Sequence, residues 1–177
     1  YHPVTLSSSQ STKPFENLLS AIEQFKDFNQ IFTLPNSDPY SELIKNIIIK
    51  HVKKKPNSRF FSQSVGNFIY LNLLKNCELV IGNSSSGIIE APSFKIPTIN
   101  IGDRQEGRLK AKSTINCDTS KQQIIKSIEK ATGKKFKSIC ARVVNPYGDG
   151  RSSKRIVKIL KSLKYPLQIK KKFYNIK

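Results

Sequence analysis

One short stretch, residues 79–90, combines a buried strand, a polar turn and the start of a helix. Residues 79–81 are an apolar run, which is typical of a strand covered on both faces. Gly82 begins the turn, which passes through three serines and a glycine into a helix predicted over residues 86–94. A unit of this kind belongs to a parallel α/β sheet, so it restricts the whole chain to that fold class.

The rest of the chain alternates the same two patterns. Apolar residues recur at helical spacing in several segments, with short apolar runs between them. Helices are predicted over residues 14–25, 39–54, 68–76, 86–94, 120–131 and 152–163. Strands are predicted over residues 31–34, 59–61, 78–81 and 97–101. Short connections between alternating strands and helices predict a Rossmann-like α/β fold, with one parallel sheet and helices on both faces.

The chain of 177 residues carries a formal net charge of +19, which suggests nucleic-acid binding as one alternative. The lysines, however, are spread along almost every predicted helix, and no basic stretch alternates with stacking aromatic residues. We therefore expect a solvated basic surface and no specific nucleic-acid partner. Residues 1–163 are expected to form one domain, and residues 164–177, with five lysines and no acid, a basic tail.

Two features of the sequence bear on its wider context. It contains no methionine, and residues 1–5 resemble the exit of a strand, so we expect the C-terminal part of a longer protein with a truncated first strand. No apolar run reaches the roughly 18 residues that a membrane span needs, so none is expected.

The metal-binding and redox-active residue types are sparse. Cys77, Cys117 and Cys140 are odd in number and widely spaced, which predicts reduced thiols in a cytoplasmic protein. No Asp-rich cluster or closely spaced histidine pair occurs, so neither a metal nor a redox cofactor is expected. His51, near the end of a predicted helix, is expected to be a cation at the helix C-terminus.

Polar clusters follow the predicted strands. In parallel sheets the carboxyl ends of the strands form the ligand-binding edge. The clusters are His2, Asn36 with Asp38, Gln63 with Ser64, residues 83–86 and residues 102–104. Any one of them could be a plain polar loop, but together they predict one site. The serine turn offers hydroxyls and free N–H groups to an anion, and Glu90 lies roughly 6–8 Å further along, near the distance from a diphosphate to a ribose diol. These features indicate a nucleotide.

At these residues the chain resembles the hydrolysing UDP-N-acetylglucosamine 2-epimerases and their relatives in sialic and legionaminic acid pathways. The matching stretches are His2-Pro3-Val4-Thr5, Pro35-Asn36-Ser37-Asp38, Gly82-Asn83-Ser84-Ser85-Ser86-Gly87 with Glu90, residues 97–108, and Asn145-Pro146-Tyr147-Gly148-Asp149-Gly150. The resemblance implies the C-terminal half of a two-domain glycosyltransferase-B-like fold. It implies a UDP-sugar substrate, with the catalytic carboxylates in the N-terminal domain. This half alone is expected to bind UDP weakly and to turn over nothing.

The resemblance also implies roles for residues of the serine turn. Ser84 and Ser85 would bind the diphosphate, within a loop that includes Asn83, Ser86 and Gly87. A plain helix cap is the alternative for the serines. Glu90 would accept both ribose hydroxyls, or be a surface glutamate.

Further roles fall on neighbouring loops. Arg104 would face the phosphates or the sugar. His2 would assist proton movement near the diphosphate, unless it is a strand end without a role. Ser64 and Val65 would present backbone groups to uracil, and Asn36 and Asp38 would approach the sugar or form an Asx turn.

The function implied is conversion of UDP-N-acetylglucosamine, or a related UDP-2-acetamido sugar, to the free C2-inverted sugar and UDP. A glycosyltransferase of the same two-domain build is one alternative, and a non-enzymatic polyanion-binding module is another. The expected partners are the UDP-sugar and the protein's own N-terminal domain, and homo-oligomerisation is left open.

Overall fold

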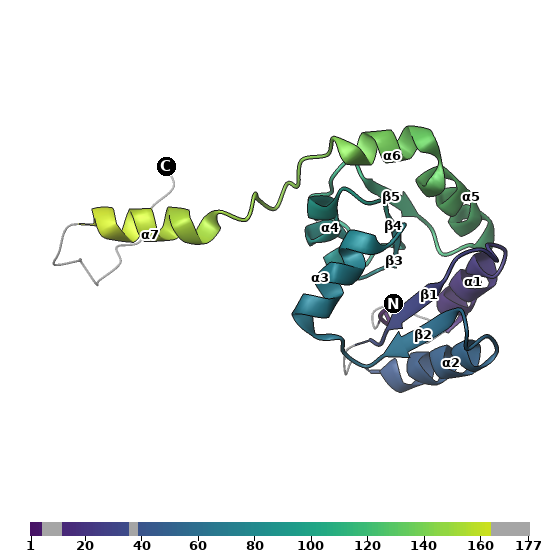
Figure 1. The fold of residues 1–177 in the computed structure, drawn as a ribbon. Helices are drawn as coiled ribbons and strands as arrows, with labels where there is room; N and C mark the ends of the chain where they lie inside the picture. Colours follow the sequence, from purple (N-terminus) through teal and green to yellow (C-terminus); the bar gives the residue numbers. More distant parts are fainter. Residues whose placement is uncertain (5–11, 36–38, 164–177) are drawn as a thin grey trace, which may run out of the picture. The chain divides into compact units, whose positions relative to one another are not determined.

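The structure is a computed structural model that describes residues 1–4, 12–35 and 39–163. It forms two compact units, residues 1–147 and residues 148–177 (Figure 1). The second unit contains helix α7 (Ser152–Ser162), and all the other elements below belong to the first. Asn36, Asp38 and the predicted tail at residues 164–177 lie outside the described residues.

Strands and helices alternate through most of the first unit. The helices are α1 (Lys13–Ile22), α2 (Ser41–Lys53), α3 (Gly66–Asn76), α4 (Ser86–Ile89), the 3-10 helix η1 (Ala91–Phe94), α5 (Lys121–Thr132) and α6 (Lys134–Ala141). The strands are β1 (Gln30–Thr33), β2 (Arg59–Ser62), β3 (Val80–Gly82), β4 (Thr98–Ile101) and β5 (Thr114–Cys117). The predicted α/β fold with parallel strands is confirmed.

The strands form two parallel sheets in the described part of the chain, where a single sheet was predicted. One sheet pairs β1 with β2, and the other has the order β3-β4-β5. Ile31 lies beside Phe60 in the first, and Ile99 lies beside Ile115 in the second. Residues 1–4 belong to neither sheet. Instead, the backbone of His2 binds the side chain of Asn83.

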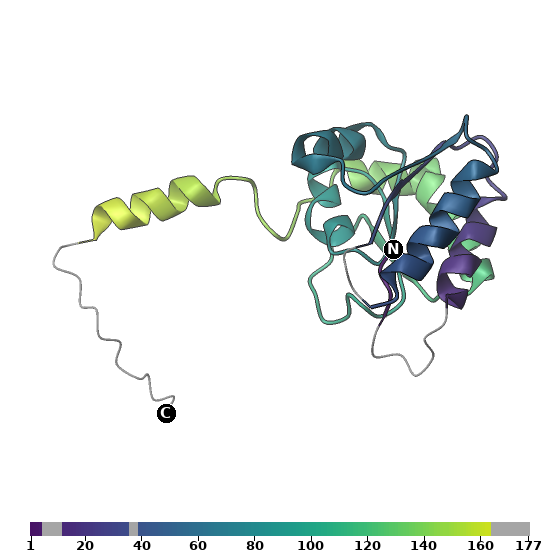
Figure 2. The ribbon, with the colours of Figure 1, turned by 90° about the horizontal axis from the view of Figure 1, so that it is seen from below.

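Helices cover both faces of the β3-β4-β5 sheet (Figure 1). The larger core cluster joins α1, α2, α5 and α6 to β4 and β5 through residues such as Phe15, Ile48, Ile99 and Ile124. Helix α1 packs beside α5 (Figure 1 and Figure 2). A smaller cluster on α3 and η1 contains Leu74, Ala91 and Ile96. Within the described ranges no helix has both the length and the hydropathy needed to cross a bilayer.

The predicted helix at residues 86–94 is interrupted. It is a one-turn α4 followed by η1, with Glu90 at the joint. Pro92 explains the break, because it has no N–H group to continue the α-helical pattern. Strand β5 and helix α6 were not predicted. Strand β5 has only a short apolar signal, whereas α6 places Phe136, Ile139 and Cys140 at helical spacing, which could have been recognised.

The prediction that His51 is a cation at the helix C-terminus is wrong. His51 is 5% exposed, and its Nε2 lies 2.9 Å from Oε1 of Gln30. Burial and the neighbouring Arg59 lower the pKa of His51 to about 4, so the ring is neutral at pH 7. Arg59 is itself buried, and it donates to the carbonyl of His51 at 3.0 Å and to Glu23 at 3.3 Å. This polar cluster joins α1, α2 and β2.

Candidate functional site

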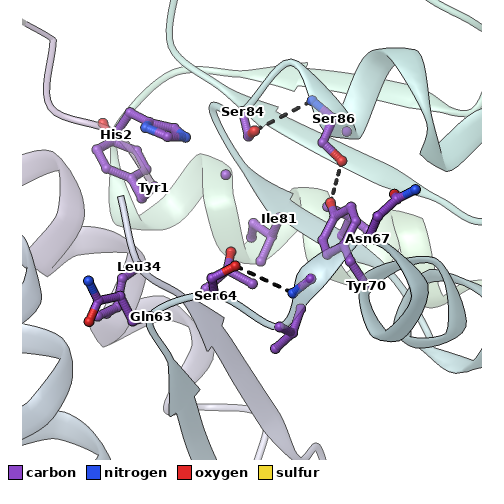
Figure 3. A pocket seen from close by; sticks show the side chains of 16 residues that line it. Tyr1, His2, Leu34, Gln63, Ser64, Asn67, Tyr70, Ile81, Ser84 and Ser86 are labelled. Atoms are coloured by element: carbon purple, nitrogen blue, oxygen red, sulfur yellow. Dashed lines mark hydrogen bonds between the residues drawn. The ribbon is translucent and has the colours of Figure 1, made fainter. Parts of the chain in front are cut away.

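A cavity of about 360 Å³ opens at the carboxyl ends of β1, β2 and β3 (Figure 3). Residues predicted for the site from three parts of the sequence line it: His2, Ser64 with Val65, and Ser84 with Ser86 and Gly87. Thr33 and Leu34 complete the wall at the end of β1. The cavity therefore brings together the separate polar clusters that follow the strands.

The serine turn is held by hydrogen bonds within itself. The N–H of Ser86 donates to Oγ of Ser84 at 3.4 Å, and the N–H of Gly87 donates to the carbonyl of Ser84 at 3.3 Å. The carbonyl of Ser85 accepts from Ile88 and Ile89 at 3.0 and 2.9 Å. Because α4 is a single turn, its dipole is small, and the serine hydroxyls are the main groups that the turn can offer to an anion.

Tyr70 is a cavity residue that the sequence analysis missed. It lies on α3, and its hydroxyl is hydrogen-bonded to the hydroxyl of Ser86 (Figure 3). Burial, together with the Glu90 carboxylate, raises the pKa of Tyr70, although the Ser86 hydrogen bond acts in the opposite direction. The phenol is therefore a neutral hydrogen-bonding group at pH 7. Its only sequence signal was an aromatic residue in a helix that follows a polar loop.

Glu90 is half-buried at the joint between α4 and η1. The carboxylate lies near enough to Tyr70 to influence its pKa, but Glu90 does not line the cavity itself.

Asn83 is fully buried, and both its side-chain amide and its carbonyl are hydrogen-bonded within the protein. Its Oδ1 accepts from the N–H of His2 at 2.7 Å, and its Nδ2 donates to the carbonyl of His2 at 2.8 Å. Its own carbonyl accepts from Nη1 of Arg104 at 3.0 Å and from Nε2 of Gln105 at 2.8 Å. Asn83 thus holds His2 and Arg104 beside the serine turn.

The loop between β2 and α3 forms another wall of the cavity. The hydroxyl of Ser62 donates to the carbonyl of Ser64 at 3.1 Å, and Oγ of Ser64 accepts from the N–H of Gly66 at 3.4 Å. Gly66 has φ of +68°, a conformation that glycine adopts without steric cost. The chain can therefore turn sharply from β2 into α3 and present its backbone to the cavity.

The site has no cluster of metal ligands in the part of the chain that the structure describes. There, no group of three or more His, Cys, Asp or Glu side chains could hold a metal ion. The cysteines Cys77, Cys117 and Cys140 are free, and burial raises the pKa of each thiol.

The fold and the cavity define a Rossmann-like α/β module with a polar site at the carboxyl ends of its strands. Residues 1–161 match the family model described as UDP-N-acetylglucosamine 2-epimerase. The chain belongs to this family.

Two curated relatives support the assignment. A hydrolysing GDP/UDP-N,N'-diacetylbacillosamine 2-epimerase from Campylobacter jejuni is 39% identical over 77% of this chain and 35% of its own length. The polysialic acid biosynthesis protein P7 of Escherichia coli is 37% identical over 99% of this chain and 45% of its own length. The chain therefore spans less than half the length of these relatives.

A solved structure agrees on the fold. The UDP-GlcNAc 2-epimerase of Methanocaldococcus jannaschii, in complex with UDP-GlcNAc and UDP, superposes with a TM-score of 0.67. The match has 23% sequence identity and covers 90% of this chain and 44% of that structure.

Proposed function

We propose that this chain is the UDP-binding half of a hydrolysing 2-epimerase that acts on a UDP-2-acetamido sugar. The substrate is UDP-N-acetylglucosamine or UDP-N,N'-diacetylbacillosamine, the latter suggested by the name of the Campylobacter jejuni relative. The observation that carries the proposal is the cavity in which His2, Ser64, Ser84 and Ser86 meet from three separate parts of the sequence. Hydroxyls and backbone N–H groups beside a histidine and an arginine suit a diphosphate.

In this proposal the nucleotide lies across the carboxyl ends of the strands. Backbone groups of residues 63–66 face the uracil, and the turn at residues 84–87 binds the diphosphate. Glu90 accepts the ribose hydroxyls. Asn83 does not contact the nucleotide but holds His2 and Arg104 in place, because its side chain is fully engaged with His2. Asn36 and Asp38 remain proposed sugar contacts.

The proposed reaction begins with loss of the C2 proton to a base. The C1–O bond breaks, its electron pair leaves with the diphosphate oxygen of UDP, and a C1–C2 double bond forms. Water then adds, with a proton to C2 on the opposite face and hydroxide to C1, which releases the free C2-inverted sugar. The serine turn and Arg104 stabilise the charge that develops on the departing diphosphate. His2 assists proton movement beside it, and the C2 acid and base come from the other half of the enzyme.

We further propose that the domain spans residues 1–163 and that residues preceding Tyr1 supply a strand between β1 and β3. Among residues 1–4, 12–35 and 39–163, β1 pairs with β2 alone and β3 with β4 alone, so each of these two strands has an open hydrogen-bonding edge there. Residues at the ends of both strands line the same cavity. Such a strand would fill the apolar part of the cavity beside Val80 and Ile81, and the polar part of the cavity would remain open to the ligand.

The wider role follows from the same proposal. The enzyme would act in the cytoplasm, as its free cysteines suggest, within a sialic-acid-type pathway. Its partners would be the UDP-sugar, its own N-terminal domain and further copies of itself. The basic surface would attract acidic ligands generally.

The test is product analysis with the full-length protein and each UDP-sugar, without an acceptor. Formation of UDP and the free C2-inverted sugar, detected by NMR, supports the proposal. A product that remains UDP-linked indicates a non-hydrolysing epimerase, and no turnover indicates a glycosyltransferase. Salt-sensitive DNA binding that Ser85→Ala leaves intact, with no UDP binding, would instead indicate a polyanion-binding module.

A further inference from the structure

Asn145 lies far from the cavity in sequence, but its side chain reaches the segment that carries Glu90. Its Nδ2 donates to the carbonyl of Ile89 at 2.8 Å and to Oγ of Ser93 at 2.7 Å. Its Oδ1 accepts from the N–H of Tyr147 at 2.9 Å. The acceptors at residues 89 and 93 lie on either side of Glu90, so one carboxamide spans the joint between α4 and η1.

The carbonyl of Ile89 needs this donor because of the break in the helix. In a continuous α-helix it would accept from the N–H of Ser93, four residues further on. Here the N–H of Ser93 donates to the carbonyl of Glu90 instead, at 3.0 Å. The Ile89 carbonyl is one of the groups that a helix end leaves unsatisfied, and Asn145 satisfies it.

The segment of Asn145 is itself anchored on its other side. The hydroxyl of Tyr147 donates to the carbonyl of Leu109, in the loop that follows β4, at 3.0 Å. Asn145 is therefore supported from two directions. Its contact can resist rotation about the Glu90 joint, where φ is −99° and ψ is −48°.

We propose that Asn145 is a positioning residue that sets the direction of the Glu90 carboxylate toward the ribose diol. This inference rests on the proposed function, in which Glu90 binds the ribose of UDP. If Asn145 only stabilised a surface turn or capped a helix, its loss would not change how the protein distinguishes ligands with and without ribose hydroxyls. As a positioning residue, it contributes to that discrimination.

The test measures the dissociation constants of UDP and 2′,3′-dideoxy-UDP for the full-length protein. The dissociation constant of 2′,3′-dideoxy-UDP divided by that of UDP measures how much the ribose hydroxyls contribute to binding. We expect Glu90→Gln to reduce the ratio roughly tenfold, about the worth of one hydrogen bond to a charged group. Asn145→Ala should reduce it to a similar extent. Ser93→Ala, which removes one of the two acceptors but keeps the bond to Ile89, is the matched control and should leave the ratio unchanged.

The possible results distinguish failure of the Asn145 inference from failure of the proposed function. If Asn145→Ala weakens both ligands equally and leaves the ratio intact, its role is architectural and the inference is overturned, while the proposed function stands. If wild-type protein does not bind UDP, or Glu90→Gln leaves the ratio intact, the proposed ribose site fails and the inference fails with it. Asn145→Ser, which keeps a short donor, replaces Asn145→Ala if the latter does not fold. Failure of both to fold also overturns the inference.

Discussion

The side chain of Asn83 forms two hydrogen bonds with the backbone of His2, at 2.7 and 2.8 Å, across 81 positions of sequence. The backbone of His2 donates one bond and accepts the other, as it would in a β-ladder, but its partner is a side-chain amide. The carbonyl of Asn83 also accepts from Arg104 and Gln105. The turn after β3 therefore positions a histidine and an arginine that are about 100 residues apart in the sequence.

Asn83→Ala removes both hydrogen bonds to the half-buried backbone of His2. We expect a loss of about 1–3 kcal/mol in the free energy of unfolding, measured by urea denaturation. We also expect kcat/KM to fall toward that of His2→Ala, because the histidine loses the two hydrogen bonds to Asn83 that help to position it. Asn72→Ala is the control, since Asn72 is an exposed asparagine that donates to a backbone carbonyl on α3 at 2.9 Å. Equal effects of the two variants would contradict the role of Asn83.

The serine turn makes a separate prediction about ligand chemistry. Ser84→Ala and Ser86→Ala should each weaken UDP binding roughly tenfold, as expected for the loss of a hydrogen bond to a charged phosphate. Binding of uridine, which has no phosphate, should be unaffected. Isothermal titration of both ligands measures this difference, with Ser138→Ala on the exposed face of α6 as the control. A parallel loss of uridine binding would mean that the serines shape the cavity rather than bind phosphate.

The strand and helix order of this domain was largely predictable from its sequence. Apolar patterns located α1, α2, α3, α5, α7 and four of the five strands that the structure describes. The pattern is clearest in α1, α2 and α5, each of which buries several residues at helical spacing. The α4 region was less predictable, since Pro92 replaces a continuous helix with two short ones. The contact between His2 and Asn83 also could not be predicted from local patterns, because it depends on tertiary structure.

The predicted site is partly assembled in the structure. His2, Ser64, Val65, Ser84, Ser86 and Gly87 line the cavity, whereas Ser85, Glu90 and Arg104 lie outside its lining. Tyr70 and Asn145 escaped prediction because their importance depends on the partners that the fold gives them. The same is true of His51, whose lysine-rich surroundings in sequence gave no sign of its burial.

His51 predicts a pH dependence of stability. The pKa of His51 is about 4 in the folded protein, against an ordinary value of 6.5. Between these two pH values His51 binds a proton in the unfolded chain but not in the folded chain. The free energy of unfolding should therefore fall as the pH decreases from 6.5 to 4, by roughly 2–3 kcal/mol in total. Above about pH 7.5 the histidine is neutral in both states and the contribution is flat.

Urea denaturation between pH 4 and 7.5 measures this dependence. His51→Gln should show a shallower slope than wild type, because glutamine does not titrate. Asn72→Ala, which changes no titratable group, is the control and should keep the wild-type slope. An unchanged slope in His51→Gln would show that other groups cause the acid sensitivity.

Gly87 is required because α4 packs directly on β4. A Cβ at Gly87 would lie 2.8 Å from Cγ2 of Thr98. Thr98 cannot rotate away easily, since it is buried and its Oγ1 donates to the carbonyl of Gly87 at 2.8 Å. Gly87→Ala should therefore lower the free energy of unfolding by about 1–3 kcal/mol and weaken UDP binding by displacing the serine turn. Gly133→Ala is the control, because Gly133 has φ of −69° and its added Cβ would meet nothing closer than 3.4 Å. Wild-type stability in Gly87→Ala would show that α4 can shift on the sheet without cost.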